Sequence, residues 1–584
     1  METEKGVHDT YSSESPVPPA VGESAAHKDK WTTRFVDSFR RDPNAGTTAS
    51  HGNGGKGFDI ETAAAATAES PLARKLKGRH LQMIAIGGSI GTGLFVGSGK
   101  ALAAGGPASL LIAFGLIGVM LYCTVHALGE MAVLFPVAGS FSAYSTRFID
   151  PAWGFAMGWN YAMQWLVVLP LEIVAASITV NFWNHGEIDN SAWVTIFLVL
   201  IISINMFGVK GYGEAEFVFS IIKVIAVIGF IILGIILNVG GGPHGGYIGG
   251  RYWHNPGAFN HGFKGLCSVF VTAAFSFAGT ELVGLAAAET ANPRKALPTA
   301  VKQVFWRITL FYIVSLTLVG LLVPYNDHRL LSGSSSADAT ASPFVIAIQN
   351  AGISGLPSVI NVVIMISVLS VGNSSIYASS RTLAGLASQG QAPRIFGYID
   401  RKGRPMVGII FSSALGFLAY LASSPAEGDV LSWMLAISGL SSIFTWGSIC
   451  LAHIRFRRGW AAQGHTLDEL AFRSQPGTIG SWCGLIFNIL VLIAQFWTGF
   501  APIGYSEMSA GEMVESFFAA YIAFPIVLLF YFPYKFWYKT PFVRAKDMDL
   551  HTGIREMNLA ELIAEERAEQ ATWPAWKRAW KFLC

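Results

Sequence analysis

Long apolar stretches separated by short polar connections occupy most of the chain. Each stretch is long enough for the roughly 20 residues that a membrane-spanning helix needs. We predict twelve spans, at residues 81–104, 107–135, 152–183, 192–208, 214–238, 264–285, 301–324, 356–380, 405–423, 429–453, 480–500 and 513–537. The pattern therefore indicates an all-α polytopic membrane protein.

Composition agrees with this class. Hydrophobic residues make up 52% of the chain and charged residues only 13%, whereas a soluble domain carries about 25% charge. A net charge of +3 without a basic stripe excludes a nucleic-acid partner. The five cysteines show no metal-ligand spacing, so we expect neither a metal nor a cofactor.

The basic residues of the connections indicate the orientation. An even number of spans places both ends of the chain on the same side. With both ends inside, the outer connections carry only Arg251, Lys264 and Arg329 as basic residues, and the remaining basic loop residues face the cytoplasm. The positive-inside rule therefore predicts a multi-pass protein with both termini cytoplasmic.

Both ends of the chain are polar. Residues 1–78 are rich in Ser, Ala, Gly and Pro and have little to bury, which predicts a disordered cytosolic tail. We expect the transmembrane domain at 79–540 and a cytosolic C-terminal tail at 541–584.

The C-terminal tail combines tryptophan with basic residues. Trp573, Trp576 and Trp580 recur at spacings of three and four, which predicts an amphipathic helix at a membrane surface. Cys584, just beyond them, is a candidate for palmitoylation. The alternative is a plain solvated tail with an incidental cysteine.

Two spans contain clusters that disfavour a continuous helix. Gly87 to Gly93 in the first span includes four glycines in seven positions, and Phe275 to Glu281 lies about halfway along the sixth span. The second break lies five spans after the first. Interrupted helices at matching positions of two five-helix units indicate an inverted-repeat transporter.

The breaks predict a particular chemistry. An unwound segment leaves backbone groups that lipid cannot satisfy. The half-helix after Gly93 offers N–H groups and a positive dipole end to a carboxylate, and carbonyls around Phe275 to Ala278 offer acceptors to an ammonium group. Together they would bind a zwitterionic α-amino acid. The alternative for each cluster is close helix packing through small residues.

Ten tracts, taken in order, resemble the fungal amino acid permeases of the yeast amino acid transporter family, within the amino acid–polyamine–organocation superfamily, and look most like general amino acid permeases. They are Gly87–Phe95, Gly129–Met131 with Phe135-Pro136, Gly158–Tyr161, Leu169–Glu172, Phe277–Glu281, Glu289–Lys295, Ser370–Ser375, Ser380–Leu383, Phe444–Gly447 and His453–Arg457. The similar segments extend from Arg79 to about Glu556. The resemblance implies a five-plus-five inverted repeat with broken helices 1 and 6, followed by two extra helices.

The resemblance also implies a substrate site at the two breaks and on the tenth span. Its residues would be Ser89, Ile90, Gly91, Thr92, Gly93, Phe275, Ser276, Phe277, Ala278, Gly279, Thr280 and Thr445. The first-helix tract would hold the carboxylate. Phe275, Ser276 and Ala278 would offer carbonyls to the amine, and Phe277 would form a wall or gate. The tenth span resembles that of the broad-range permeases at Ser438, Ser441, Ser442, Thr445 and Trp446, and this resemblance favours a broad or neutral substrate range.

Ionisable residues inside spans are usually functional. Glu281 is the first candidate for a proton carrier, with a static hydrogen bond to the broken backbone as the alternative. The resemblance implies that Lys223 takes the place that a sodium ion occupies in sodium-driven relatives and would bridge the fifth and first helices. The alternative is a fixed ion pair or carbonyl contact. Glu172 is a candidate second carboxylate for proton coupling. We interpret His126 as a satisfied bundle histidine and Glu130 as a salt-bridge partner of a loop arginine.

The sequence thus predicts a permease and not an enzyme: a proton-coupled symporter that imports L-amino acids across the plasma membrane by alternating access. The proton gradient would supply the energy. Expected partners are amino acids, protons and the lipid bilayer, and Lys5, Lys28, Lys30 and Lys56 could accept ubiquitin from a ligase. The alternatives are an amino acid sensor with little or no transport and, within transport, an exchanger.

Overall fold

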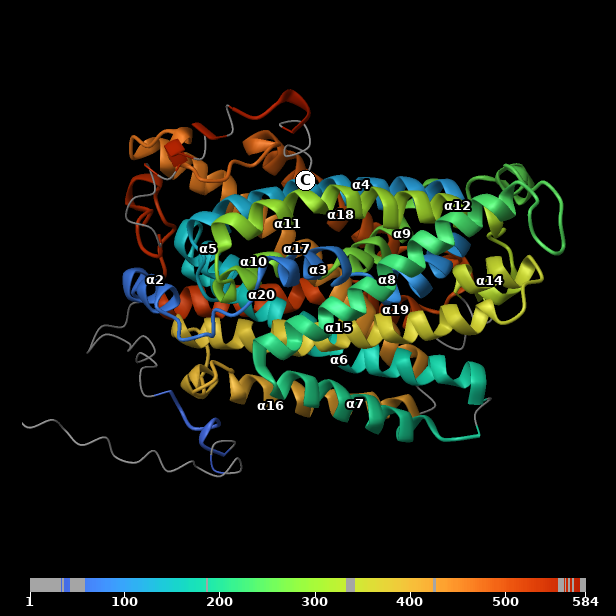
Figure 1. The fold of residues 1–584 in the computed structure, drawn as a ribbon, viewed down its shortest axis with the longest axis horizontal. Helices are drawn as coiled ribbons and strands as arrows, with labels where there is room; N and C mark the ends of the chain where they lie inside the picture. Colours follow the sequence, from blue (N-terminus) through green and yellow to red (C-terminus); the bar gives the residue numbers. More distant parts are fainter. Residues whose placement is uncertain are drawn as a thin grey trace, which may run out of the picture.

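The computed structural model describes residues 36–42, 58–184, 187–331, 342–423 and 427–554, together with Thr33 and scattered positions between 561 and 577. Within these residues the regular structure is helical, and the long helices lie side by side, running in roughly the same direction (Figure 1). Two isolated backbone bridges, Arg41 with Asp400 and Leu76 with Thr290, are the other pairings in the described part. The predicted all-α class is confirmed.

The predicted twelve spans are present in the described residues. Eight helical segments are long and apolar enough to cross a membrane, and the longest of these, Gly93–Leu134, contains parts of two spans. It divides at Gly106, which lies just before Pro107 and has a φ of 81°, a value that suits glycine. A pair of helices bent by 61° adds one span, and two shorter apolar helices complete the set.

The first five spans are, in order, α3 (Gly78–Gly87) with the π-helical η1 (Gly93–Gly97) and the start of α4 (Ser98–Leu134); the rest of α4; α6 (Pro151–Asn184); α7 (Asn190–Met206); and α8 (Gly208–Asn238). The next five are α9 (Gly262–Phe277) with α10 (Leu282–Ala286); α11 (Pro293–Arg307) with the π-helical η4 (Ile308–Val314) and α12 (Ser315–Leu322); α15 (Leu356–Ser388); α16 (Met406–Leu415) with η7 (Gly416–Ser423); and α17 (Glu427–Ala462). The last two are α18 (Gly477–Phe500), and α19 (Ala510–Tyr521) with α20 (Ala523–Tyr538).

Both predicted breaks are observed. The first interrupts the first span between α3 and η1, where the backbone leaves the helix after Gly87. The second interrupts the sixth span between α9 and α10, where Ala278 is extended (ψ 141°) and Gly279 has a φ of 97°. An L side chain rarely adopts that φ, so the second break needs its glycine.

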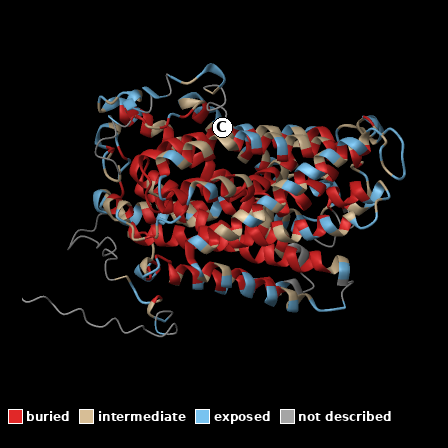
Figure 2. Ribbon diagram, viewed as in Figure 1, coloured by how far each residue is buried: buried red, intermediate tan, exposed pale blue. Residues whose placement is uncertain are grey.

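The broken spans lie inside the bundle. The segment α3 packs against α8, α10 and α11, and α9 packs against α4 and α17, while α6 and α15 run side by side (Figure 1). Buried positions gather between the helices and exposed positions on their outward faces (Figure 2). On α8, for example, Ile225, Ile228 and Ile232 are exposed, whereas Glu216 and Lys223 are buried. An apolar outer face around a polar interior suits a bilayer.

Part of the N-terminal tail has a defined structure, which corrects the disorder predicted for all of residues 1–78. Helix α2 (Ile60–Ala68) precedes the first span, and Leu72 and Leu76 are buried. The stretch 36–42 lies along the connection before α16, because Arg401 N donates to Arg40 O at 2.9 Å and Asp42 N donates to Ile399 O at 3.2 Å. These contacts depend on partners distant in the chain, which composition does not reveal.

The segment after α20 also returns to the bundle. Val543 N donates to Ile149 O at 3.1 Å, and Arg147 Nη2 lies 3.2 Å from Asp549 Oδ2. Farther along, Lys577 lies over the ring of Trp573 at 4.3 Å, and Trp576 is exposed. The rest of the predicted amphipathic helix, with Trp580 and Cys584, lies outside the described residues, so the helix and its lipidation stay predictions.

Candidate substrate and coupling site

The first break leaves backbone donors free. Within it, Ile90 N donates to Gly87 O at 3.1 Å and Phe95 N donates to Gly91 O at 3.2 Å. The N–H groups of Gly91 and Thr92 have no backbone acceptor among the described residues. They lie just before the next helical segment begins, at a terminus whose dipole favours an anion.

The second break faces the first. A Cβ on Gly279 would lie 3.2 Å from Gly88 O, and a Cβ on Gly93 would lie 2.7 Å from Ser276 Oγ. The glycines therefore let two unwound backbones approach more closely than side chains would allow. Of the predicted sixth-helix residues, Phe275 and Phe277 supply carbonyls to Ala278 N and Thr280 N, at 3.1 and 3.4 Å.

A tyrosine that the sequence analysis missed joins the two breaks. The hydroxyl of Tyr312, on η4, lies 2.7 Å from Ser276 O and 3.2 Å from Ser89 O. Its ring packs against Phe277 with centroids 4.1 Å apart, so the predicted wall residue is itself held in place. Nothing in the sequence distinguishes this tyrosine from the other aromatic residues of the spans. Its position on a π-helical turn does distinguish it, because such turns often mark functional sites.

Glu281 is completely buried and surrounded by hydrogen-bond donors. Tyr161 Oη donates to Oε1 at 3.1 Å, Trp446 Nε1 donates to Oε2 at 3.1 Å, and Gly279 N lies 3.2 Å from both oxygens. The hydrogen bond to the broken backbone, which the sequence left as an alternative, is thus present. A role as proton carrier stays a prediction.

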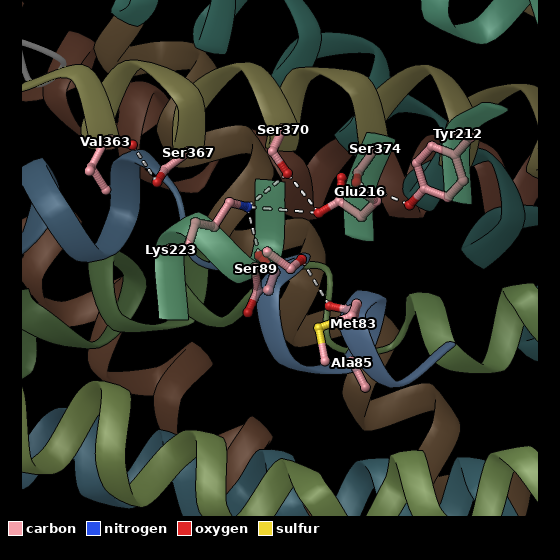
Figure 3. Close-up of polar contacts among 12 residues, drawn as sticks. Met83, Ala85, Ser89, Tyr212, Glu216, Lys223, Val363, Ser367, Ser370 and Ser374 are labelled. Atoms are coloured by element: carbon pink, nitrogen blue, oxygen red, sulfur yellow. Dashed lines mark hydrogen bonds and ion pairs between the residues drawn. The ribbon is translucent and has the colours of Figure 1, made fainter. Parts of the chain in front are cut away.

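Lys223 connects three helices (Figure 3). Its Nζ donates to Gly87 O at 2.8 Å and to Ser370 Oγ at 2.7 Å, and it lies 3.8 Å from Glu216 Oε1. Ser370 in turn donates to Glu216 Oε1 at 2.6 Å. The lysine therefore spans the fifth and first helices, as both readings of the sequence expected. Glu216 is not among the residues predicted from the sequence, although a spacing of seven puts it on the same helical face as Lys223.

Glu172 reaches the first break from the third span, because Thr92 Oγ1 donates to its Oε2 at 2.5 Å. Thr445 faces the third span instead. Its hydroxyl accepts from Asn160 Nδ2 at 3.3 Å, and one turn away Gln164 Nε2 donates to Ser442 Oγ at 2.8 Å. These contacts form a polar, uncharged seam between α6 and α17.

The two remaining ionisable residues of the sequence analysis lie away from the breaks. Glu130 accepts from Arg457 Nη2 at 2.8 Å and from His453 Nε2 at 3.1 Å, so the expected arginine pair exists, although Arg457 belongs to α17 and not to a loop. The ring of His126 lies beside that of Tyr122, tilted by 54° with centroids 4.4 Å apart, and neither ring nitrogen has a hydrogen-bond partner in the described part of the chain. The interpretation of His126 as a satisfied histidine is therefore wrong.

Twelve spans with the first and sixth interrupted at the centre, and free backbone groups where the interruptions meet, define a secondary transporter of the discontinuous-helix class. The amino acid permease family model matches residues 80–546. The chain belongs to the amino acid permease family, and it is a transporter and not an enzyme.

Proteins of similar sequence are also amino acid permeases. The chain is 58% identical to the general amino-acid permease GAP2 of Candida albicans, over 100% of this chain and 97% of that protein. It is also 58% identical to the general amino-acid permease GAP1 of Saccharomyces cerevisiae, over 95% of this chain and 92% of that protein. A solved structure of the Eremococcus coleocola manganese transporter superposes with a TM-score of 0.47 at 10% identity, over 84% of this chain and 96% of that one.

Proposed function

We propose that this chain is a plasma-membrane symporter that imports a broad range of L-amino acids together with protons. The observation that carries the proposal is the meeting of the two breaks, with unpaired N–H groups on one side and main-chain carbonyls on the other. The general amino-acid permeases that resemble the chain over nearly its whole length support a broad range.

The substrate would lie between the breaks. Its carboxylate would accept from the N–H groups of Gly91 and Thr92, and its ammonium group would donate to carbonyls of the second break, whose oxygens each have a second lone pair. Its side chain would point to the seam between α6 and α17, where Asn160, Gln164 and Thr445 offer uncharged polar groups. An uncharged seam favours neutral side chains over strictly cationic ones.

The charges at the breaks support coupling to a proton. The buried ionisable groups there comprise three carboxyl groups and two bases: Glu172, Glu216, Glu281, Lys223 and Arg307. With all five ionised, the group has one excess negative charge, and net charge inside a membrane is unfavourable. One bound proton makes the group neutral, and a zwitterionic substrate leaves it neutral. We assign the proton to Glu281, with Glu172 next.

Further parts of the proposal concern the cell. Both termini would face the cytoplasm, and the proton gradient would be the sole energy source, without a cofactor. Ubiquitin would be attached to the N-terminal lysines, which lie outside the described residues. Cys584 would be palmitoylated at the membrane surface.

Uptake into cells that lack their own amino acid permeases tests the proposal. A labelled amino acid panel is followed at acidic and neutral external pH, with and without a protonophore. Glu281→Gln removes the titratable proton at nearly constant volume, and Glu507→Gln, an exposed residue of a connecting turn, is the matched control. We expect acid-stimulated, protonophore-sensitive uptake in the native chain and the control, and its loss in Glu281→Gln.

Other results would point elsewhere. Unchanged pH dependence in Glu281→Gln would move the proton site to Glu172. Uptake that needs preloaded amino acid and ignores the protonophore would indicate exchange. Correctly localised protein that takes up nothing would favour the sensor.

A further inference from the structure

A buried arginine links the two breaks. Arg307, the last residue of α11, is 1% exposed. Its Nη1 donates to Ala85 O on α3, and its Nη2 donates to Thr280 Oγ1 at the second break. Arg307 is not among the residues predicted from the sequence, although an arginine inside a predicted span indicates a functional position.

The partners of this arginine are unusual for a buried cation. A guanidinium has five N–H groups and is best satisfied by a carboxylate. Here the two bonds go to a carbonyl and a hydroxyl, and the buried Nε has no partner among the described residues. Thr280, which this guanidinium contacts, is followed directly by Glu281, so the contact places the arginine one residue from a buried carboxyl group. The arginine is therefore held beside an acid with donors still unused.

The groups around Glu281 come from four directions. Tyr161 on α6 and Trp446 on α17 donate to the carboxyl group, Gly279 donates from the break itself, and Arg307 on α11 donates to Thr280, the residue before Glu281. The first three are neutral. Arg307 alone among these four carries a full positive charge, so its distance from Glu281 governs how well an ionised carboxylate is tolerated.

Building on the proposed proton carrier Glu281, we propose that Arg307 is the positioning residue that drives the proton off when the transporter opens inward. The segment α3 is the N-terminal half of the first span, on the cytoplasmic side in the proposed orientation. Alternating access moves one part of the bundle against the other. When α3 leaves α11, Arg307 loses Ala85 O and its free donors turn to Glu281.

The proton balance of the cycle follows from this contact. Outside-facing, Glu281 is a neutral carboxylic acid and Arg307 is occupied by Ala85 O. Inside-facing, the O–H bond of Glu281 breaks, the proton passes to cytosolic water, and the carboxylate pairs with the guanidinium. As α3 returns, Arg307 is recaptured by Ala85 O, and Glu281 takes the next proton from outside.

Purified protein in liposomes with a pH dye inside separates this role from a structural one. We compare the native chain with Arg307→Gln, which removes the charge, and Arg307→Lys, which keeps it. Lys302→Gln is the control, because it removes a positive charge from α11 more than one helical turn away from Arg307. Three rates are measured: amino acid exchange at equal pH, accumulation driven by a pH gradient, and proton influx caused by amino acid.

The proposal expects exchange within about threefold of native in Arg307→Gln. A gradient of about two pH units allows about 100-fold accumulation for one proton per substrate. The accumulation ratio of Arg307→Gln should be lower than that of the native chain by a factor of about ten or more. Arg307→Lys should recover part of it, and Lys302→Gln should match the native chain.

Each other outcome overturns the inference in a distinguishable way. Native coupling in Arg307→Gln removes Arg307 from the mechanism and leaves proton symport standing. If Arg307→Gln loses both exchange and accumulation, Arg307 is needed for the structure of the transporter and has no specific role in coupling. Absence of proton influx in the native chain refutes symport itself, and this inference with it.

Discussion

The pair of Lys223 and Glu216 offers a sharp test of how the core is held together. Both side chains are 0% exposed, and Lys223 Nζ lies 3.8 Å from Glu216 Oε1. Lys223→Met keeps a long flexible chain but removes the charge and the donors. Glu216 is then left buried with Ser370 as its donor, and Gly87 O loses the lysine N–H.

The expected magnitude follows from those losses. Removing one partner of a buried ion pair destabilises by about 3–5 kcal/mol, because an uncompensated charge remains. The double variant Lys223→Met with Glu216→Gln leaves no charge behind. Its Gln can still accept from Ser370, and Gly87 O keeps the hydrogen bond from Ile90 N. The remaining loss is therefore mainly the hydrogen bond from the charged lysine to Gly87 O, about 1.5–3 kcal/mol. The double variant should therefore be more stable than Lys223→Met alone.

The assay is heat-induced loss of the monodisperse protein in one detergent at one pH. The native chain should survive to the highest temperature, the double variant to an intermediate one, and Lys223→Met to the lowest. Conserved stability in Lys223→Met, or a double variant no better than it, would refute the assignment of a charged pair. An effect limited to transport would make Lys223 a functional contact and not a structural one.

Two further predictions concern the breaks and the cytoplasmic face. Gly93→Ala should destabilise the protein by about 1–3 kcal/mol and slow uptake, because the added Cβ would lie 2.7 Å from Ser276 Oγ. Gly115→Ala is the control: its added Cβ would have its nearest neighbouring atom at 3.9 Å, so it should behave like the native chain in the same assays. Asp549→Asn should speed proteolysis of the C-terminal segment. Burial raises the pKa of Asp549, but the charge of Arg147 and nearby N–H groups outweigh it and hold the pKa below its ordinary value. The ion pair therefore stabilises the segment fully at any pH above the ordinary pKa of an aspartate, and this stabilisation is lost only as the pH falls through the lowered pKa. Equal proteolysis of native and variant protein at neutral pH would contradict this.

The sequence by itself determined the spans, the two breaks and the family. Span positions follow from local hydropathy, because a bilayer requires about 20 apolar residues in a row. The breaks follow from glycine clusters, which act on the backbone where they stand. Both are local properties of the chain. Confirmation of the interrupted first and sixth helices shows how far this information reaches.

Tertiary structure decided which side chains meet. Tyr312 and Arg307 serve the breaks because a π-helical turn and the packing of α11 against α3 direct them there. For the same kind of reason, the ring nitrogens of His126 have no hydrogen-bond partner among the described residues, and helix α2 forms within the N-terminal tail. Hydropathy gives the depth of a residue in the membrane but not the rotation of its helix or the identity of its neighbour. A hydrogen bond depends on all three, so the coupling network emerges only when the helices are packed.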